Sequence, residues 1–159
     1  MTANNVTRLL DNRNVPYTCF DLPRQKLGAE KVAELLNAPL SIIYKSIVIE
    51  RKNPGKPILA VVPGDKEVDL KKLAKAVGEK KVSPATQMAA ENSTKLQAGG
   101  ISPLALINRG FEIVIDESIL EQELVHISGG ELGVNIRLSP RDLVSLTKAL
   151  VAKICRELS

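Results

Sequence analysis

The chain has 159 residues, 22 Lys and Arg against 18 Asp and Glu, and 44% apolar residues, which suits one soluble folded domain over residues 1–159. One His and two Cys exclude a multi-His or Cys-rich zinc site, so we expect neither a metal nor a cofactor. The scarcity of aromatic residues, two Tyr and two Phe without Trp, argues against a protein that stacks several nucleic-acid bases on its side chains.

Apolar periodicity and turn residues predict helices and strands mixed along the first half of the chain. The helix at the N-terminus would be capped by Asn5 or Thr2, and Pro16 favours an edge position for the strand that follows. Asp69 and Gly78 would begin and end a lysine-rich helix. The predicted helices are 6–13, 28–37 and 70–77, and the predicted strands are 15–20, 41–51 and 58–62, the last two joined by a turn over 51–57.

In the second half, Ser83 and Pro84 predict a helix start, with the helix running to about Ala90 and a further short helix near Asn92. Strands are expected over 111–115, 125–128 and 134–138. Ser139 and Pro140 then predict a long C-terminal helix with its apolar residues inward, namely Leu143, Leu146, Leu150 and Ile154. This order predicts a mixed α/β fold with a barrel-like sheet surrounded by helices.

The N-terminus lacks a signal-peptide core, and no segment reaches the roughly 18 apolar residues of a membrane helix, so we expect a cytoplasmic protein without a membrane partner. The positive charge lies in the first half of the chain. A group of lysines, Lys71, Lys72 and Lys75, shares one predicted helix face. This face is either an ordinary solvated surface or a binding surface for a phosphate backbone.

Lys45 lies inside the strongest predicted strand, among β-branched residues. It is either a charge that protects a strand edge or an ammonium group at the mouth of a pocket, where it would hold a phosphate or polarise a carbonyl.

Two glycine pairs form the other candidate site. The loop Gly99, Gly100, Ile101, Ser102 and Pro103 would let backbone N–H groups approach an oxyanion or a phosphate. Ser128, Gly129 and Gly130 follow a predicted strand directly. Each pair alone is equally compatible with an ordinary surface turn.

We find no nucleophile paired with a base. The only histidine, His126, is expected to be structural, and Cys19 and Cys155 are expected to be free, buried or half-buried thiols. An enzyme with this sequence would therefore work through positioning, backbone dipoles and groups of its substrate.

Five segments in order carry a family resemblance: IIYKSIVIE, VDLKKLAKAVGEKKV, GGISPLAL, IVIDESIL and HISGGELGVNIRLSPRDLV. Together they resemble the YbaK/ProX-type aminoacyl-tRNA deacylases, freestanding relatives of the editing domain of bacterial prolyl-tRNA synthetases. The resemblance extends from about Val6 to Leu150.

The resemblance implies a role for each motif. Lys45 would bind near the terminal adenosine and fix the scissile ester, the loop from Gly99 to Pro103 would line the aminoacyl pocket, and Ser128 to Gly130 would lie beside it. Phe20 stands where relatives often have Tyr, and Asn135 where they often have Asp or Gln. Both would contact the substrate, and Leu27, Ile101 and Val134 would set the pocket volume with Phe20.

The implied partner is the 3′ end of an aminoacyl-tRNA, and the implied activity is trans-editing. Such an enzyme removes a wrong amino acid that a synthetase pocket rejects poorly. Cys-tRNA(Pro) is the first expected substrate and Ala-tRNA(Pro) the second, with prolyl-tRNA synthetase as a possible partner. The alternatives are a catalytically silent module of the same fold that binds tRNA or a synthetase, and an enzyme acting on another small ester or nucleotide.

Overall fold

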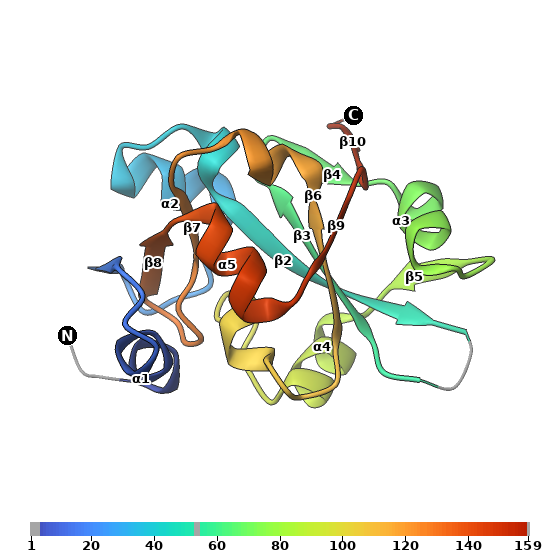
Figure 1. Cartoon of the computed structure of the whole chain (residues 1–159), viewed down its shortest axis with the longest axis horizontal. Helices are drawn as coiled ribbons and strands as arrows, with labels where there is room; N and C mark the ends of the chain where they lie inside the picture. Colours follow the sequence, from blue (N-terminus) through green and yellow to red (C-terminus); the bar gives the residue numbers. More distant parts are fainter. Residues whose placement is uncertain (1–3, 53–54, 159) are drawn as a thin grey trace.

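The structure is a computed structural model that describes residues 4–52 and 55–158. Figure 1 shows the helices arranged around strands that run through the middle of the molecule. The α-helices are α1 (Asn5–Asn12), α2 (Ala29–Leu36), α3 (Leu70–Val77), α4 (Gln87–Thr94) and α5 (Pro140–Thr147). The strands are β1 (Tyr17–Asp21), β2 (Tyr44–Arg51), β3 (Ile58–Pro63), β4 (Lys66–Val68), β5 (Val82–Pro84), β6 (Glu112–Asp116), β7 (Val125–Ser128), β8 (Val134–Leu138), β9 (Leu150–Ala152) and β10 (Cys155–Glu157).

The strands form three sheets. The largest has the order β5-β2-β3-β6-β9, in which β3, β6 and β9 run parallel and the other pairs antiparallel. A three-stranded antiparallel sheet has the order β1-β8-β7, and β4 pairs with β10. The mixed α/β fold is therefore confirmed, as is the edge position of β1. None of the sheets closes on itself within the described residues, so the barrel-like closure is not confirmed.

The core has two apolar clusters, one on each face of β2. Tyr44 and Val48 belong to the larger cluster, which also holds residues of α1, β7, β8 and α5. Ile49 belongs to the smaller cluster with Leu73 of α3 and Ile154. The alternation of side chains along a strand explains this division. A strand that is buried on both faces therefore anchors the whole molecule.

The N-terminal elements agree with the sequence pattern, with two corrections. The strand predicted over 41–51 begins only at Tyr44, because Leu40–Ile42 form a 3-10 helix. The cap of α1 is Asn4 and not Asn5, while Thr2 lies outside the described residues: Asn4 Oδ1 accepts from Thr7 N at 2.9 Å, and Thr7 Oγ1 accepts from Asn4 N at 2.9 Å. Asp69 and Gly78 do begin and end α3, since Asp69 accepts from Lys72 N and Gly78 takes a φ of 75°. Within the predicted turn 51–57, residues 53 and 54 lie outside the described residues.

The helix start at Ser83 and Pro84 is wrong. These two residues end β5, which pairs with β2, and the helix begins at Gln87 with Thr86 as its cap. A single helix then continues to Thr94, so there is no separate helix at Asn92. Pairing to the edge of β2 has overridden a local start signal.

The long C-terminal helix is also wrong. The helix α5 ends at Thr147, because Lys148 adopts a left-handed conformation with a φ of 53°. The chain then forms β9 beside β6 and β10 beside β4. Leu150 is exposed, whereas Ile154 is buried in the smaller cluster. The segment after Thr147 therefore forms strands, and the helical spacing of its apolar residues is a coincidence.

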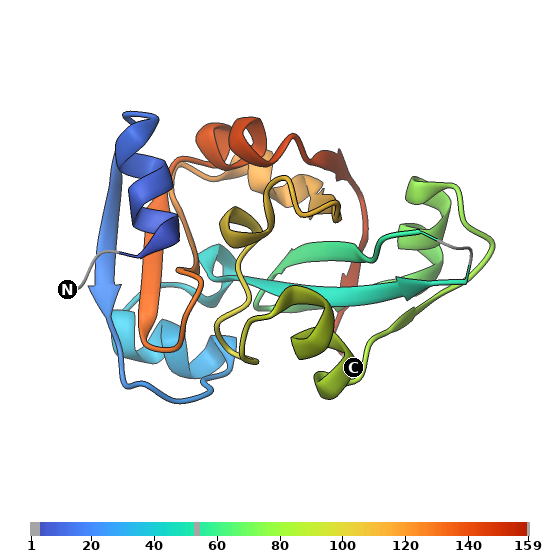
Figure 2. The same ribbon diagram turned by 90° about the horizontal axis from the view of Figure 1, so that it is seen from below.

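The two ends of the molecule are built from different secondary-structure elements. Figure 2 shows α1, α2 and the three-stranded sheet at one end and α3 at the other, with the larger sheet between them. No helix in the described part of the chain is long and apolar enough to cross a membrane.

Candidate active site

A pocket that is lined by several of the predicted site residues lies between the two larger sheets, at the end of the molecule that holds α2. Its cavity has a volume of about 330 Å³. Its walls come from the irregular segment 22–28, the first turn of α2, the start of β2, the loop 98–101 and the facing strands β7 and β8. The lining is mainly apolar, and the side chains that give it this character include Leu22, Leu27, Val32, Ile43, Tyr44, Ile47, Ile101 and Val134.

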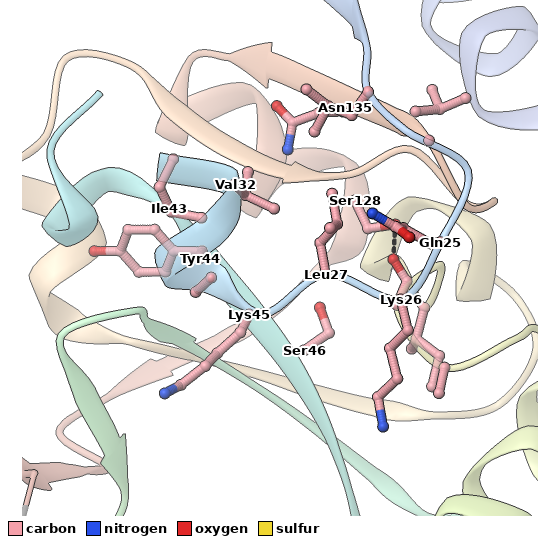
Figure 3. Close-up of a pocket in the computed structure, with 18 of the residues that line it drawn as sticks. Gln25, Lys26, Leu27, Val32, Ile43, Tyr44, Lys45, Ser46, Ser128 and Asn135 are labelled. Atoms are coloured by element: carbon pink, nitrogen blue, oxygen red, sulfur yellow. Dashed lines mark hydrogen bonds between the residues drawn. The ribbon is translucent and has the colours of Figure 1, made fainter. Parts of the chain in front are cut away.

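The start of β2 forms one wall because its neighbour β5 is short. β5 pairs only with Ile49 to Arg51, so the edge of β2 from Tyr44 to Ile47 has no strand partner within the described residues. Lys45 and Ser46 both line the pocket. Lys45 is half-buried and forms neither a hydrogen bond nor an ion pair with the described residues. Figure 3 shows its ammonium group extending away from the pocket interior, at the rim.

Lys45 is therefore an uncompensated cation at the mouth of an apolar pocket. A lysine that only protects a strand edge points into solvent and needs no pocket beside it. An ammonium group at the rim, without an ion-pair partner among the described residues, is suited to attract an anionic or carbonyl oxygen of a ligand.

The two glycine loops pack directly against one another. A Cβ on Gly100 would lie 3.0 Å from the backbone of Glu131, and a Cβ on Gly99, whose φ is 92°, would lie 3.1 Å from Lys26 Cα. Ser128 Oγ donates to Gly99 O at 3.5 Å, so the serine of one loop contacts the glycine of the other (Figure 3). These positions need glycine because backbone approaches backbone. The structure thus brings together the two motifs that the sequence had presented separately.

The predicted site residues do not all reach the pocket. Gly99, Ile101 and Ser128 line it, and so do Lys45 and Asn135. Ser102 is fully buried, and its Oγ accepts from Leu104 N at 3.2 Å as the cap of the 3-10 helix Pro103–Leu106. The remaining predicted residues that do not line this pocket are Phe20, Gly100, Pro103, Gly129 and Gly130.

Backbone N–H groups are available in the first glycine loop. Gly100 N donates to Gln97 O at 2.8 Å. Within the described residues, the N–H groups of Gly99 and Ile101 have no acceptor. Unpaired N–H groups at a pocket wall are candidates for stabilising developing negative charge on an oxygen.

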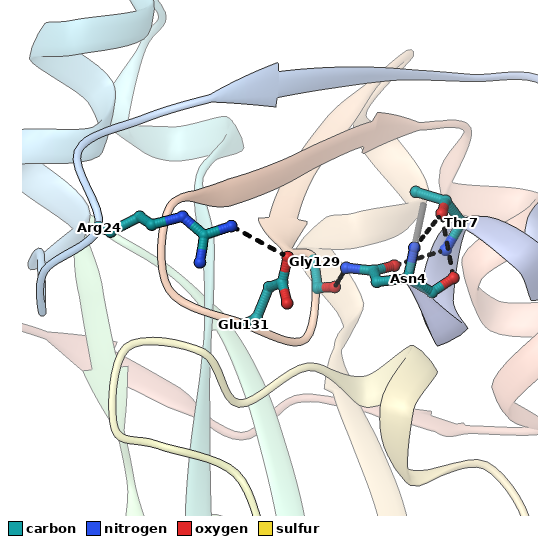
Figure 4. A network of polar contacts seen from close by, with 5 residues as sticks. All are labelled: Asn4, Thr7, Arg24, Gly129 and Glu131. Atoms are coloured by element: carbon teal, nitrogen blue, oxygen red, sulfur yellow. Dashed lines mark hydrogen bonds and ion pairs between the residues drawn. The ribbon is translucent and has the colours of Figure 1, made fainter. Parts of the chain in front are cut away.

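The second glycine loop is tied to the N-terminal helix. Asn4, which caps α1, also donates from Nδ2 to Gly129 O at 3.0 Å (Figure 4). On the other side, Arg24 and Glu131 form an ion pair at 3.8 Å between segment 22–28 and this loop. The exposed ion pair contributes little stability, and the hydrogen bond from Asn4 is the firmer attachment.

Phe20, Asn135 and Ser128 occupy matching positions on three adjacent strands. Phe20 pairs with Asn135 across β1 and β8, and Asn135 pairs with Ser128 across β8 and β7. Their side chains therefore belong to one face of the sheet. Phe20 does not line the pocket, and its ring centroid is 5.5 Å from that of His126 and 5.3 Å from Arg137 Cζ.

His126 is buried and its Nδ1 lies 2.8 Å from Asn135 Oδ1, which agrees with the predicted structural role. Burial lowers the pKa of His126, and the nearby Arg137 acts in the same direction, against the hydrogen bond with Asn135. The imidazole is therefore neutral near pH 7.

The cysteines are free thiols, half-buried at Cys19 and buried at Cys155. Burial and the adjacent Asp116 raise the pKa of Cys155, so it is not a reactive thiolate. No group of three or more His, Cys, Asp or Glu side chains that could hold a metal ion occurs in residues 4–52 and 55–158.

The α3 lysines lie away from the pocket. Lys71 and Lys75 are exposed, while Lys72 Nζ donates to Cys155 O at 2.9 Å. Both views place α3 at the end of the molecule opposite α2 (Figures 1 and 2).

Several pocket residues carried no recognisable signal in the sequence. Gln25 and Lys26 lie in an irregular segment without periodicity, and Ser46 lies beside the more conspicuous Lys45. Only the resemblance pointed to part of this wall, through Leu27, Ile101 and Val134, which do meet at the pocket.

Comparison with known proteins fits this geometry. The family model described as the aminoacyl-tRNA editing domain matches residues 24–146. The chain is 35% identical to the candidate Cys-tRNA(Pro)/Cys-tRNA(Cys) deacylase EbsC of Enterococcus faecalis, over 94% of this chain and 92% of that protein. It is 26% identical to the prolyl-tRNA editing protein ProX of Acetoanaerobium sticklandii, over 88% of this chain and 87% of that protein.

A solved structure extends the similarity to the fold. The crystal structure of a candidate trans-editing enzyme for prolyl-tRNA synthetase matches with a TM-score of 0.79 and 25% identity, covering 98% of this chain and 99% of that one. The resemblance to YbaK/ProX-type proteins is thereby confirmed, and the chain belongs to the aminoacyl-tRNA editing domain family.

Proposed function

We propose that this protein is a trans-editing deacylase that cleaves the ester between a wrong amino acid and the 3′ end of tRNA. The observation that carries the proposal is the pocket itself, an apolar cavity with Lys45 at its rim and with Gly99 and Ile101 in its wall, whose N–H groups have no acceptor among the described residues. The 35% identity to EbsC supports the same reaction class.

The reaction requires stabilisation of a developing oxyanion more than it requires a strong nucleophile. An aminoacyl ester is already activated, and attack on its carbonyl places negative charge on one oxygen. We infer that Gly99 and Ile101 N–H donate to this oxygen and that Lys45 holds the ester or the terminal adenosine from the rim. Within the described residues, no nucleophile hydrogen-bonded to a base lines the pocket, so water or a group of the substrate would attack.

The size and apolar lining of the cavity support a small, weakly polar aminoacyl group. We propose Cys-tRNA(Pro) as the first substrate, in line with the name of the relative EbsC, and Ala-tRNA(Pro) as the second. We further propose that the chain acts as one editing domain in the cytoplasm, that prolyl-tRNA synthetase is a partner, and that Lys71, Lys72 and Lys75 contact the tRNA backbone away from the pocket.

The direct test measures release of amino acid from Cys-, Ala- and Ser-tRNA(Pro) by the wild type and by Lys45→Met. Methionine keeps the apolar stem of lysine and removes only the charge, so the fold should be unchanged. We expect kcat/KM to fall by about a hundredfold, the usual cost of removing one group that stabilises the transition state.

Lys80→Ala is the matched control, because Lys80 is exposed and does not line the pocket. It should retain wild-type activity. No release from any charged tRNA would refute the reaction class, while full activity of Lys45→Met would refute only the role of Lys45. Salt-sensitive tRNA binding without release would identify the silent binding module instead.

A further inference from the structure

Asn135 places a buried carboxamide on the pocket wall. The residue is 5% exposed, lines the pocket, and lies in the middle strand of the three-stranded sheet. A buried amide costs free energy unless its oxygen and nitrogen both find partners. Which of these two atoms faces the ligand therefore decides what the pocket recognises.

His126 fixes this choice. Its Nδ1 lies 2.8 Å from Asn135 Oδ1, and because an amide oxygen can only accept, Nδ1 must carry the proton. The amide nitrogen is then on the opposite side of the carboxamide. Figure 3 shows that nitrogen turned toward the pocket, and Nδ2 has no acceptor within the described residues.

The surroundings keep His126 in this state. The imidazole is 3% exposed, lies against the ring of Phe20, and has its backbone bridged to Ile43. Arg137, its cross-strand neighbour, places a positive charge nearby. A second proton on the ring would be buried beside a cation, so the neutral ring with a protonated Nδ1 is favoured.

We propose that Asn135 is a hydrogen-bond donor to the substrate and that His126 is the positioning residue that aims it. An NH2 group offers two donors and no acceptor, so it suits an ester carbonyl or ribose oxygen and not the α-ammonium group of the aminoacyl moiety. The inference rests on the proposed function for the identity of the ligand, but not for the orientation of the amide.

The orientation can be tested without any ligand. Because His126 is the only histidine, 15N-histidine labelling gives a single imidazole spin system in a long-range 1H–15N spectrum. We expect a neutral ring protonated on Nδ1. A ring protonated only on Nε2 would make Nδ1 an acceptor, reverse the amide, and overturn the proposal.

The substrate role is tested by binding of the alanyl amide of 3′-amino-3′-deoxyadenosine, an analogue that is not cleaved. His126→Phe keeps an aromatic ring but removes the donor, and Asn135→Ala removes the amide. Each substitution should raise the dissociation constant for the analogue about tenfold, which is the effect of losing one aligned hydrogen bond.

His126→Asn is the conservative variant, because its Nδ2 can occupy the place of imidazole Nδ1 and still donate to Asn135. Its dissociation constant for the analogue should stay within about threefold of the wild-type value, and its KM for deacylation should rise by no more than the same factor. If His126 had only a structural role, folded His126→Phe would bind the analogue as tightly as the wild type does. That result would overturn the proposal.

Failure of the proposed function has a different signature. A wild type that neither binds the analogue nor releases amino acid from tRNA would remove the substrate role of Asn135, whereas the histidine spectrum would still decide the amide orientation. Should His126→Phe lose its cooperative thermal transition, His126→Asn and Asn135→Ala carry the test.

Discussion

At the scale of single residues, the pocket combines one ammonium group, one buried amide and two backbone N–H groups that have no acceptor in the described part of the chain. Lys45 supplies charge at the rim, while Gly99 and Ile101 supply dipoles at the wall. None of these groups acts as an acid or a base in the proposed reaction. The activity should therefore depend on how the groups are placed, and substitutions that preserve shape but remove a donor are the informative ones.

His126 makes the stability of the fold depend on pH. Its pKa in the folded protein is lowered from 6.5 by burial, and Arg137 adds to this. Below about pH 6.5 the unfolded chain binds a proton that the folded chain resists, so stability is full above that pH and falls as the pH drops. We predict a lower Tm at pH 5.5 than at pH 7.5 for the wild type.

His126→Phe should flatten the difference in Tm over this interval. Asp116 does not interfere with the comparison, because its pKa is lowered from 3.8: burial raises it, but hydrogen bonds from Ser118 and Ile154 outweigh that. Its contribution is lost only below about pH 4. An unchanged pH dependence of Tm in His126→Phe would show that His126 is not the group responsible.

The site residues that could be predicted from the sequence are those whose chemistry is unusual for their position in the chain. Lys45 in an apolar strand and two glycine pairs drew attention for that reason, and Lys45, Gly99 and Ser128 do line one pocket. Ser102 looked equally suitable, but its hydroxyl caps a 3-10 helix. A serine before proline has the same sequence pattern whether it serves a fold or a reaction, so only packing separates the two.

At the scale of elements, the second glycine loop depends on α1 for its position. Asn4 caps the helix and also donates to Gly129 O, so one side chain joins the helix to the loop beside the pocket. The loop itself is crowded, since a Cβ on Gly129 would lie 2.3 Å from Val134 Cγ1. Helix and loop therefore form one structural unit.

Asn4→Ala should affect both stability and activity. Loss of the cap and of the bond to Gly129 should lower the free energy of unfolding by about 1–2 kcal/mol, measured by denaturant titration. Release of the loop should also lower kcat/KM for deacylation, by up to about tenfold, because Ser128 and Gly99 would lose their fixed separation.

Asp69→Ala is the matched control for a lost cap. Asp69 caps α3 by accepting from Lys72 N, and α3 lies at the end of the molecule opposite the pocket. Its loss should cost about 1 kcal/mol of stability and leave kcat/KM unchanged. Equal effects of the two substitutions on activity would show that the bond from Asn4 to Gly129 does not position the site.

Local signals predicted the elements that have strong periodicity and caps of their own, such as α3 between Asp69 and Gly78. They failed where pairing with distant strands decides the outcome. β5 exists because it pairs with β2, and β9 because it pairs with β6, far away in the sequence. Such partners leave no mark within a short window of sequence.

At the scale of the whole molecule, the pocket lies where the three-stranded sheet meets the larger one, and the lysine-rich α3 lies at the far end. The resemblance predicted the family and the mixed α/β class, and both are confirmed. The sequence did not predict that the positive surface of α3 and the pocket would be separated, because charge counts carry no information about distance.

We propose that this pocket removes a wrong amino acid from tRNA and spares the right one. The most direct measurement compares initial rates of release from Cys-tRNA(Pro) and Pro-tRNA(Pro) at equal enzyme concentration. We predict that cysteine is released at least about tenfold faster than proline, within the range by which one apolar pocket separates side chains of similar size. Equal rates, or no release of cysteine above the rate without enzyme, would contradict it.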